Sequence, residues 1–250
     1  MQMRRLLPKP GTTTTQEALA GLRLGERATA RRPYVVANMV VSADGKASFG
    51  GRSGPLGGEA DRAIFHRLRT QVDAVLVGSG TVRVERYGRL VRDPQLRAAR
   101  EREGLRPDPL ACIVTRTLEL PVDTGLLQDP DQETVVFTSA GERLDGAGPG
   151  VRVVCVPAAE LTFRSVLRQL AAEWDVRSVL CEGGPTVLGV LLAEDAVDEL
   201  FLTVAPKLAG GAVAPTAVEG VPLPEPLALR PVSVLEAGGE LFLRYEIVRA

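Results

Sequence analysis

Histidine and cysteine, the side chains that most often bind zinc, are scarce in this sequence. The 250 residues include one histidine, His66, and three cysteines, and no two cysteines form a C-x-x-C pair. This scarcity all but excludes a zinc site with the usual ligands, and we expect no bound metal. It also removes nucleophilic schemes that pair serine or cysteine with histidine, unless His66 is the base. If the protein is an enzyme, we therefore expect a cofactor to supply the difficult chemical step.

The chain also lacks an excess of charge and a long apolar segment. Its 30 basic and 31 acidic residues leave a formal net charge of −1, which does not favour a nucleic-acid or membrane partner. No apolar run approaches the roughly 20 residues that cross a membrane, and no apolar segment of signal-peptide length follows Arg4, Arg5 and Lys9. We therefore expect a cytoplasmic protein that binds neither nucleic acid nor a membrane.

The few cysteines and the single histidine have ordinary structural interpretations. Cys112, Cys155 and Cys181 each lie in an apolar segment with the pattern of a strand. Cysteine in such a segment usually serves as a small core residue, so we expect three buried, reduced thiols. His66 falls in a helical segment, where a lone histidine is more often a surface or cap residue than a catalyst.

Short apolar segments alternate with helical patterns along most of the chain. We predict strands over residues 34–41, 73–77, 110–114, 134–137, 151–156, 179–181 and 198–204, and helices over 59–70, 94–103 and 163–174. A hairpin over 232–248 turns at Gly238-Gly239. Strands that alternate with helices and end in an antiparallel hairpin predict a mixed α/β sheet.

No internal repeat or linker divides the chain. We predict an N-terminal arm over residues 1–32 and a single domain over residues 33–250. Within the arm, Thr14 and Glu17 have the spacing of a capping box that begins a short helix through about Leu22. The arm is expected to pack on the domain or on a partner subunit.

Residues 176–192, V-R-S-V-L-C-E-G-G-P-T-V-L-G-V-L-L, are the most informative segment. A buried strand leads into Glu182-Gly183-Gly184, and Pro185 suits the first position of the following helix because its missing N–H needs no partner there. The glycines let a ligand approach backbone N–H groups at a helix N-terminus, which favours an anion. We interpret this turn as a phosphate or pyrophosphate site, with a plain strand-to-helix turn as the alternative.

Two other strands also end in residues that suit a phosphorylated ligand. The strand over 73–77 leads into Gly78-Ser79-Gly80-Thr81, where Ser79 or Thr81 could cap the next helix and Glu85 would share a face with Thr81. The strand over 110–114 ends in Thr115-Arg116-Thr117, a set of groups that suits a phosphate monoester or, equally, a solvated turn. Because ligands of α/β sheets bind beyond the carboxyl ends of strands, the glycine turns could face one pocket.

Two features before residue 59 have both a structural and a functional interpretation. Asn38 is the polar exception in an apolar strand, so it is either a structural tether or a group that faces a ligand. The glycine-rich residues 49–58 form a loop that is long enough to move over a site, or an ordinary surface loop.

Several motifs in a fixed order resemble a known family. They are S-A-D-G-K at 42–46, H-R-L-R at 66–69, D-A-V-L-V-G-S-G-T-V at 73–82, L-C-E-G-G-P-T-V-L at 180–188 and D-E-L-F-L-T-V-A-P at 198–206. Together they resemble the reductase domain of bacterial riboflavin biosynthesis, the RibD C-terminal family. The resemblance covers residue 34 to the C-terminus and implies a dihydrofolate-reductase-like α/β fold, with a mostly parallel central sheet flanked by helices.

The resemblance implies an activity as well as a fold. Members of that family use NADPH to reduce the ribosylamino side chain of a phosphorylated pyrimidine, by hydride transfer to the sugar C1. It thus implies an NADPH-dependent reductase of the 5-amino-6-ribosylaminouracil 5′-phosphate type, and the family's habit implies a homodimer. A pteridine or folate substrate is the first alternative, and a nucleotide-binding protein without catalysis is the second.

The resemblance also implies roles for individual residues. Those implied at the cofactor are Val40, Pro55, Gly78, Gly80, Thr81, Glu85, Thr115, Arg116, Gly183, Gly184, Pro185, Thr186, Val187 and Leu188. Those implied at the substrate are Asn38, Ser53, Arg69, Leu90 and Glu182. Arg116 would suit the 2′-phosphate of NADPH, Arg69 the substrate phosphate, and Glu182 ring or sugar hydroxyls. Glu85 and Glu182 remain alternative proton donors.

The chain departs from the family pattern at several positions. The H-x-E and P-C-x-x-C signature of the zinc deaminase domain is missing, so the resemblance implies the reductase step alone. Asn38 stands where the bifunctional enzymes often have lysine, Pro55 where they have an aromatic residue, and Glu85 where they usually have aspartate. Residues 86–90 are spaced differently from the usual D-P-x-L, so no substrate arginine is assigned there. These departures bear on the substrate more than on the cofactor.

Overall fold

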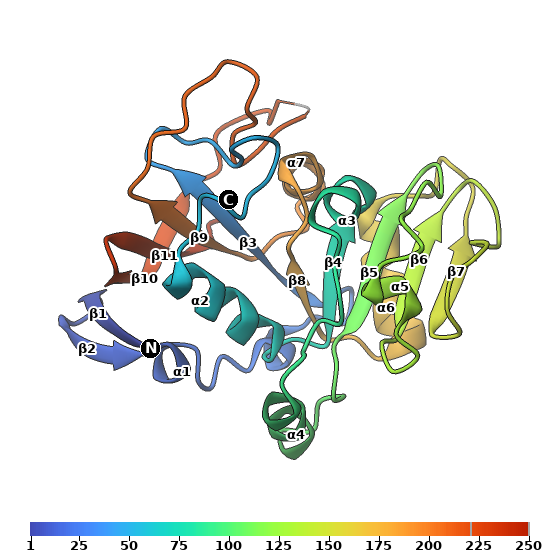
Figure 1. The fold of residues 1–250 in the computed structure, drawn as a ribbon, viewed down its shortest axis with the longest axis horizontal. Helices are drawn as coiled ribbons and strands as arrows, with labels where there is room; N and C mark the ends of the chain where they lie inside the picture. Colours follow the sequence, from blue (N-terminus) through green and yellow to red (C-terminus); the bar gives the residue numbers. More distant parts are fainter. Residues whose placement is uncertain (221, 250) are drawn as a thin grey trace. The chain divides into compact units, whose positions relative to one another are not determined.

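Two groups of strands organise the structure, a computed structural model that describes residues 1–220 and 222–249 (Figure 1). Each group belongs to a compact unit. The first unit comprises Met1–Leu22, Val35–Leu68 and Pro185–Ala250, and the second comprises Arg23–Tyr34 and Arg69–Gly184. Both units are assembled from separate stretches of chain, so residues far apart in the sequence meet within each of them. The predicted division into an arm and one domain stays a prediction.

The strands of the first unit are mostly antiparallel. They are β1 (Gln2–Leu7), β2 (Gly11–Thr14), all but the first residue of β3 (Tyr34–Ser42), β9 (Glu199–Ala205), β10 (Leu229–Ala237) and β11 (Glu240–Ile247), and their order is β2-β1-β10-β11-β9-β3. The pair β9–β3 runs parallel, and the other neighbours in this order run antiparallel. The helices of this unit are α1 (Thr15–Ala18), α7 (Pro185–Ala193) and all but the last residue of α2 (Glu59–Arg69).

The second unit is built on a parallel set of strands. These are β4 (Ala74–Gly78), β5 (Leu110–Thr115), β6 (Thr134–Thr138), β7 (Val151–Cys155) and β8 (Ser178–Cys181), in the order β8-β4-β5-β6-β7, and each neighbouring pair is parallel. The connecting helices are α3 (Ser79–Glu85), α4 (Pro94–Arg102), α5 (Gly125–Gln128) and α6 (Phe163–Trp174), and a 3-10 turn, η1 (Leu24–Arg27), lies in the shorter stretch.

The central strands of the second unit form its core. All residues of β4, β6 and β8 are buried, and β5 has one half-buried residue. Strands covered on both faces have continuous apolar sequences, and this is the pattern from which they were predicted. Helix α6 buries an apolar stripe that ends at Trp174. The Trp174 ring meets Phe137 of β6 edge to face, with 6.0 Å between the ring centroids.

Local signals in the sequence locate most of the elements correctly. The predicted strands over 34–41, 73–77 and 110–114 correspond to β3, β4 and β5, and the predicted hairpin corresponds to β10 and β11. Its turn residues Gly238 and Gly239 both have positive φ, 61° and 82°, as a tight two-residue hairpin turn requires. Pro185 is the first residue of α7, as expected.

The N-terminal residues 1–32 contain strands that the sequence does not predict. β1 pairs with both β2 and β10, so it extends the strands of the first unit. Its sequence, Q-M-R-R-L-L, has no regular alternation of apolar and polar residues, and only Met3 of this strand is fully buried. The capping box of Thr14 and Glu17 is confirmed, but α1 ends at Ala18 rather than near Leu22. Gly21, with a φ of 66°, turns the chain after it.

Two other predictions are wrong for identifiable reasons. Cys155 is exposed, whereas Cys112 and Cys181 are buried, and all three are free thiols. Cys155 ends β7, which pairs with β6 at the edge of the second unit; Arg152 and Cys155 are exposed there, and the other three residues of the strand are half-buried. Neither Ser79 nor Thr81 caps α3. Gly78 occupies the N-cap position, and in the described part of the chain this cap has no side-chain hydrogen bond.

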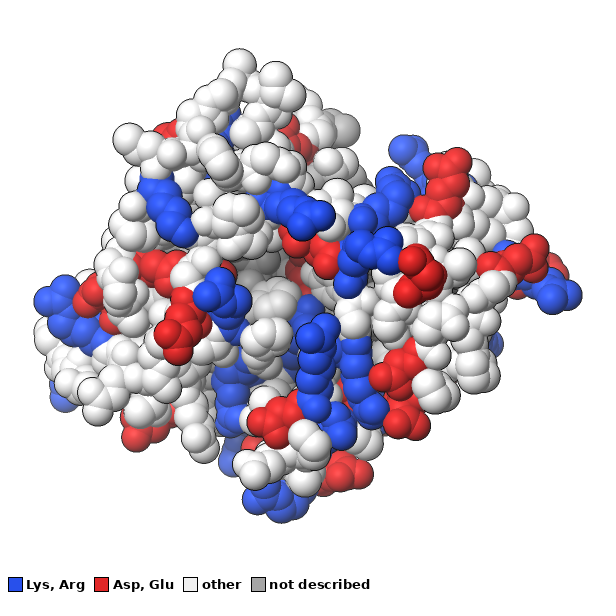
Figure 2. Space-filling view, in the orientation of Figure 1, with Lys and Arg blue, Asp and Glu red and all other residues white. Residues whose placement is uncertain are grey.

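The surface carries charges of both signs. On the face drawn in Figure 2, basic and acidic side chains are interspersed, and blue groups have red groups beside them. This distribution accords with a formal net charge of −1 and does not produce a large field of one sign on that face. Among the helices of residues 1–220 and 222–249, none is long and apolar enough to span a membrane.

Candidate active site

The order of the parallel strands in the second unit indicates where a ligand would bind. The chain leaves β4 toward β5 on one side, while β8 lies on the other side. Ligands of α/β proteins bind beyond the carboxyl ends of strands at such a switch point. The residues that follow β4 and β8 are Gly78-Ser79-Gly80-Thr81 and Glu182-Gly183-Gly184. The two glycine turns predicted to face one pocket are therefore adjacent in the structure.

Gly184 keeps the space between these two turns open. Its φ is 68°, a left-handed conformation that side chains disfavour, and a Cβ added there would lie 3.0 Å from Thr81 Oγ1. Gly80 also borders open space, since an added Cβ would meet no described atom within 4 Å. The backbone at both turns can therefore approach a bound ligand closely.

A buried ion pair lies beside the second turn. Arg69 Nε donates to Glu182 Oε1 at 2.6 Å, and Arg69 Nη2 donates to Glu182 Oε2 at 2.7 Å. The side chain of Glu182 is fully buried and that of Arg69 is 7% exposed. Burial alone would lower the pKa of Arg69, but the charge and hydrogen bonds of Glu182 outweigh it and raise that pKa. The bidentate geometry fixes both side chains.

Tyr87 completes this cluster, although the sequence did not indicate it. The Arg69 guanidinium lies over the Tyr87 ring, 5.3 Å from its centroid. Glu182 and Arg69 both lie close enough to the phenol for their charges to act on its pKa. Burial raises the pKa of Tyr87 well above its ordinary value, and the negative charges of Glu182 and Glu85 raise it further. The one available signal was the unusual spacing of residues 86–90.

The other residues predicted in the second unit have varied surroundings. The Leu90 carbonyl accepts a hydrogen bond from Arg69 Nη1 at 3.2 Å, so Leu90 contacts the ion pair through its backbone. Thr115 is buried, and its hydroxyl accepts a 3.4 Å hydrogen bond from the N–H of Thr117. Arg116, between them, is exposed at the carboxyl end of β5. These facts are compatible with both interpretations of the Thr115–Thr117 turn.

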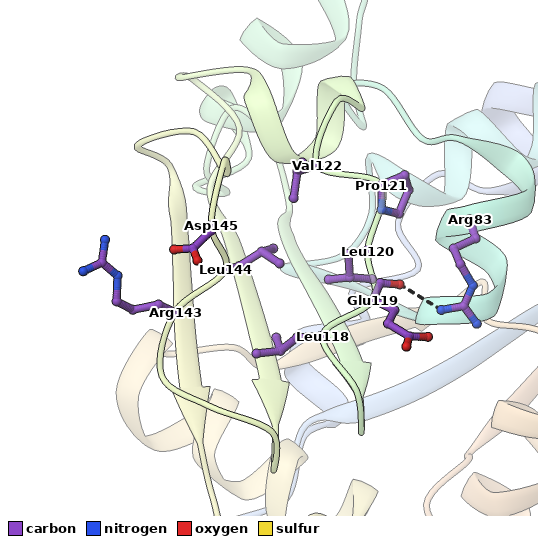
Figure 3. A pocket seen from close by; sticks show the side chains of 9 residues that line it. All are labelled: Arg83, Leu118, Glu119, Leu120, Pro121, Val122, Arg143, Leu144 and Asp145. Carbon is purple, nitrogen blue, oxygen red and sulfur yellow. Dashed lines mark hydrogen bonds between the residues drawn. The ribbon is translucent and has the colours of Figure 1, made fainter.

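A hollow of about 590 Å³ lies beyond this turn (Figure 3). Its lining combines apolar side chains with a few charged ones from the loops after β5 and β6 and from α3: Arg83, Leu118, Glu119, Leu120, Pro121, Val122, Arg143, Leu144 and Asp145. Arg83 Nη1 donates to the carbonyl of Glu119 at 2.9 Å and closes one side. Arg143 points away from the leucines in this view.

Other predicted residues belong to the first unit. Asn38 and Val40 lie two residues apart and so share one face of β3, and Val40 is the only half-buried residue of that strand. Asn38 is buried, and its Oδ1 has no hydrogen-bond partner among residues 1–220 and 222–249. A buried acceptor without a partner is costly. This observation favours the ligand-facing interpretation of Asn38 over the structural tether.

The loop over 49–58 is held by contacts from distant parts of the first unit. Lys207 Nζ donates to the carbonyls of Pro55 and Leu56 at 2.8 and 2.7 Å. Glu240 Oε1 accepts from the N–H of Gly58 at 2.6 Å. Ser53 is half-buried and Pro55 is exposed. The loop is thus attached at its second half, whereas residues 49–52 are bridged only to each other among the described contacts.

The start of α7 is packed against another loop of the first unit. The N–H of Glu219 donates to the carbonyl of Pro185 at 3.1 Å. A Cβ added at Gly189 would lie 2.0 Å from the carbonyl oxygen of Glu219, so glycine is required for this approach. Of the predicted cofactor residues here, Pro185 bonds to that loop and Leu188 is buried, and a Cβ added at Gly220 would lie 3.9 Å from Thr186 Cγ2. Val187 is exposed.

The strands and the site define a class of protein. Parallel strands with two glycine turns and a buried ion pair at a switch point are typical of α/β proteins that bind a nucleotide-like ligand. The chain belongs to the RibD C-terminal domain family, whose model it matches over residues 33–243.

Relatives and solved structures agree with this membership. The chain is 33% identical over 192 residues to the 2,5-diamino-6-ribosylamino-4(3H)-pyrimidinone 5′-phosphate reductase of Archaeoglobus fulgidus, covering 76% of this chain and 87% of that protein. It is 29% identical over 229 residues to the reductase of the same name from Aquifex aeolicus, covering 87% and 97%. A pyrimidine reductase-like protein from Corynebacterium diphtheriae is similar in structure, with a TM-score of 0.83, 23% identity and coverage of 95% and 100%. The predicted mixed α/β class is confirmed.

Proposed function

We propose that this protein is an NADPH-dependent reductase in riboflavin biosynthesis, acting on a phosphorylated ribosylaminopyrimidine of the kind named in its relatives. The observation that carries the proposal is the bidentate Arg69–Glu182 pair at the carboxyl end of β8, directly before the open turn at Gly183-Gly184. A buried charged pair at a strand end is costly to retain without a function, and it lies where α/β proteins bind their ligands.

The residues of the second unit fit a dinucleotide. Gly80 borders open space, Gly184 is in a conformation that excludes a side chain, and Arg116 is exposed on the next strand end. In our proposal, backbone N–H groups of the two glycine turns bind the pyrophosphate, and the guanidinium of Arg116 binds the 2′-phosphate that distinguishes NADPH from NADH. When bound, NADPH supplies the hydride.

The ion pair would bind and orient the substrate. Of the five N–H donors of Arg69, two bond to Glu182 and one to the Leu90 carbonyl. In our proposal, the substrate phosphate binds to the guanidinium that these contacts orient. Glu182 has remaining lone pairs that can accept hydrogen bonds from sugar or ring hydroxyls.

Hydride transfer to the sugar C1 takes place on the ring-opened imine form of the substrate, and its reduction also needs a proton, for which Glu85 and Glu182 are the candidates. Proton donation by Glu182 would break its ion pair with Arg69. We therefore favour Glu85, at the end of α3, as the donor, and assign Glu182 to substrate binding. Both carboxylates lie within electrostatic reach of Tyr87.

The test is a side-by-side assay of NADPH oxidation with 2,5-diamino-6-ribosylamino-4(3H)-pyrimidinone 5′-phosphate and with dihydrofolate. We expect turnover with the pyrimidine phosphate alone. Turnover with dihydrofolate would instead identify a folate-type substrate. Tight NADPH binding with no oxidation in either assay would mean a nucleotide-binding protein without this catalysis.

A further inference from the structure

A tight turn, Ser53-Gly54-Pro55-Leu56, lies within the glycine-rich loop over 49–58 of the first unit. The N–H of Leu56 donates to the carbonyl of Ser53 at 2.9 Å, which closes the turn. Leu56 is only 1% exposed, whereas Pro55 is exposed and Ser53 is half-buried. The side chain of Leu56 therefore anchors one end of the turn in the core, and the rest of the turn projects from it.

The ammonium group of Lys207 holds this turn from a distant part of the chain. Lys207 Nζ donates to the carbonyl of Pro55 at 2.8 Å and to the carbonyl of Leu56 at 2.7 Å, across 152 and 151 residues of sequence. Hydrogen bonds from a charged donor are stronger than those between neutral groups. The conformation of the turn thus depends on a side chain that no local pattern in the loop indicates.

The backbone around Lys207 is itself held in place. Lys207 follows β9, and its carbonyl accepts a hydrogen bond from the N–H of Ala43 at 2.8 Å. Two residues further on, the N–H groups of Ala209 and Gly210 donate to the Asp44 carboxylate at 3.0 and 2.8 Å. Because this backbone is already ordered, contact with the turn costs only the side-chain entropy of Lys207.

The other half of the loop is attached differently. Among the described contacts, residues 49–52 are bridged only to each other, through Phe49 and Arg52, and Gly50 and Gly51 both have positive φ, 59° and 80°. The half that Lys207 holds is the one with Ser53 and Pro55, which the family resemblance implies at the substrate and at the cofactor.

We propose that Lys207 is a positioning residue: its ammonium group fixes the turn over 53–56 and thereby holds Ser53 where it binds the substrate. The proposal rests on the proposed function for the identity of that substrate, but not for the hold of Lys207 on the turn. The glycine turns and Arg116, to which we assign the phosphates of NADPH, belong to the second unit. Loss of the ammonium group should therefore affect the pyrimidine substrate more than NADPH.

The first experiment compares Lys207→Met with Lys46→Met by steady-state kinetics. Lys46 is the matched control, because its Nζ also donates to a carbonyl of the segment after β9, that of Ala214 at 3.1 Å, and none of its described hydrogen bonds reaches residues 49–58. We expect Lys207→Met to raise the KM for the pyrimidine phosphate about fivefold or more, and the KM for NADPH to stay within about twofold. Lys207→Arg, which keeps a charged donor, should recover part of the loss.

A merely structural role of Lys207 would give a different result. It would lower stability and the fraction of active protein, which lowers kcat without raising the KM of one substrate. An unchanged pyrimidine KM in Lys207→Met, beside an active wild type, would overturn the proposal and leave the proposed function standing. An equal rise in Lys46→Met would also overturn it, because the effect would then belong to the whole segment after β9.

The second experiment needs no substrate and separates failure of this inference from failure of the proposed function. Trypsin cuts after exposed arginines, and Arg52 directly precedes the turn. Cleavage there measures how often the loop opens. Lys207→Met should speed the cut after Arg52 about fivefold, and Lys46→Met should not. The cut after Arg143, an exposed residue of the second unit, is the internal reference and should keep its rate.

The two assays have distinct outcomes. An unchanged rate at Arg52 in Lys207→Met would overturn the inference even if the wild type reduces the pyrimidine phosphate. A faster cut at Arg52, in a protein that reduces no pyrimidine phosphate, would support the hold of Lys207 on the turn and contradict the proposed function instead.

Discussion

Burying Arg69 and Glu182 removes two charges from water, and their mutual contact is the main interaction that offsets that cost. Replacing one partner should therefore be far more damaging than its size suggests. We expect Glu182→Gln to lower the free energy of unfolding by about 3–5 kcal/mol, because it leaves the Arg69 charge buried without its partner. Urea unfolding of the purified protein measures this change.

A control for that measurement is Glu133→Gln, which breaks an exposed pair with Arg106. Exposed pairs contribute about 0–1 kcal/mol, so this variant should unfold almost as the wild type does. Equal losses in the two variants would mean that the Arg69–Glu182 pair is no more important to stability than a surface contact.

Arg116 gives a prediction about cofactor choice. We expect Arg116→Ala to weaken NADPH binding by about 1–3 kcal/mol, because it removes a charge-assisted contact to the 2′-phosphate, and to leave NADH binding nearly unchanged. Fluorescence titration with each cofactor measures both values. Arg168→Ala, at an exposed arginine of α6, is the control and should affect neither. Similar losses for NADPH and NADH would remove the 2′-phosphate role.

Kinetics of Glu85→Gln and Glu182→Gln distinguish which of the two carboxylates donates the proton. If Glu85 donates the proton, Glu85→Gln should lower kcat by about 10²–10⁴-fold while NADPH still binds. Glu182→Gln should act mainly on the KM of the pyrimidine substrate. A large loss of kcat in Glu182→Gln but not in Glu85→Gln would instead identify Glu182 as the proton donor. Stopped-flow measurement of a single turnover distinguishes a slower chemical step from slower product release.

At the scale of elements, the glycine turns are the features whose geometry can be tested most sharply. Gly184 and Gly104 both have positive φ, but a Cβ at Gly184 would approach Thr81 Oγ1, whereas one at Gly104 would meet no described atom within 4 Å. Gly184→Ala and Gly104→Ala should therefore share a loss of about 1 kcal/mol from backbone strain. Only Gly184→Ala should also weaken NADPH binding. If Gly104→Ala weakens it equally, the turn after β8 is not part of the cofactor site.

Elements differ in how far the sequence alone locates them. β4 and β8 are continuous apolar runs because both faces are covered, and α6 carries a capping box at Thr162 and Ser165 together with an apolar stripe. Such signals are local. β1 has no comparable pattern, because it is stabilised by pairing with β10, more than 200 residues away in sequence. Cys155 is exposed because β7 is an edge strand, and strand order is not a local property.

At the scale of the whole molecule, hydrogen bonds join segments that are distant in sequence and make stability depend on pH. Asp44 accepts hydrogen bonds from the Ser42 hydroxyl at 2.6 Å and from the N–H groups of Ala209 and Gly210 at 3.0 and 2.8 Å. These bonds hold the pKa of Asp44 well below its ordinary value. Its stabilising contribution is then fully present above the unfolded-state pKa of about 3.9 and is lost as the pH falls through the folded-state pKa.

We expect Asp44→Asn to lower the free energy of unfolding. The difference from wild type should be constant near neutral pH and become smaller below about pH 4. Asp61 supplies a contrast of opposite sign, because burial raises its pKa and the nearby charge of Glu240 raises it further, against the Thr203 hydrogen bond. Asp61→Asn should therefore stabilise the protein at pH 7, where Asp44→Asn destabilises it. Thermal unfolding over a range of pH measures the stability change of each variant. If both variants change stability in the same direction at pH 7, the assigned pKa directions of Asp44 and Asp61 are contradicted.

The sequence by itself determined where most strands and helices lie, where the glycine turns interrupt them, and which family the motifs resemble, because each of these depends on neighbouring residues. Only the tertiary structure decided that Arg69 and Glu182, 113 residues apart, form one ion pair and that the Tyr87 ring lies against the Arg69 guanidinium. It also placed β8 beside β4 and Cys155 on an edge strand. The physical reason is that strand order and the burial of charge are set by contacts across the chain, which no local pattern of residues records.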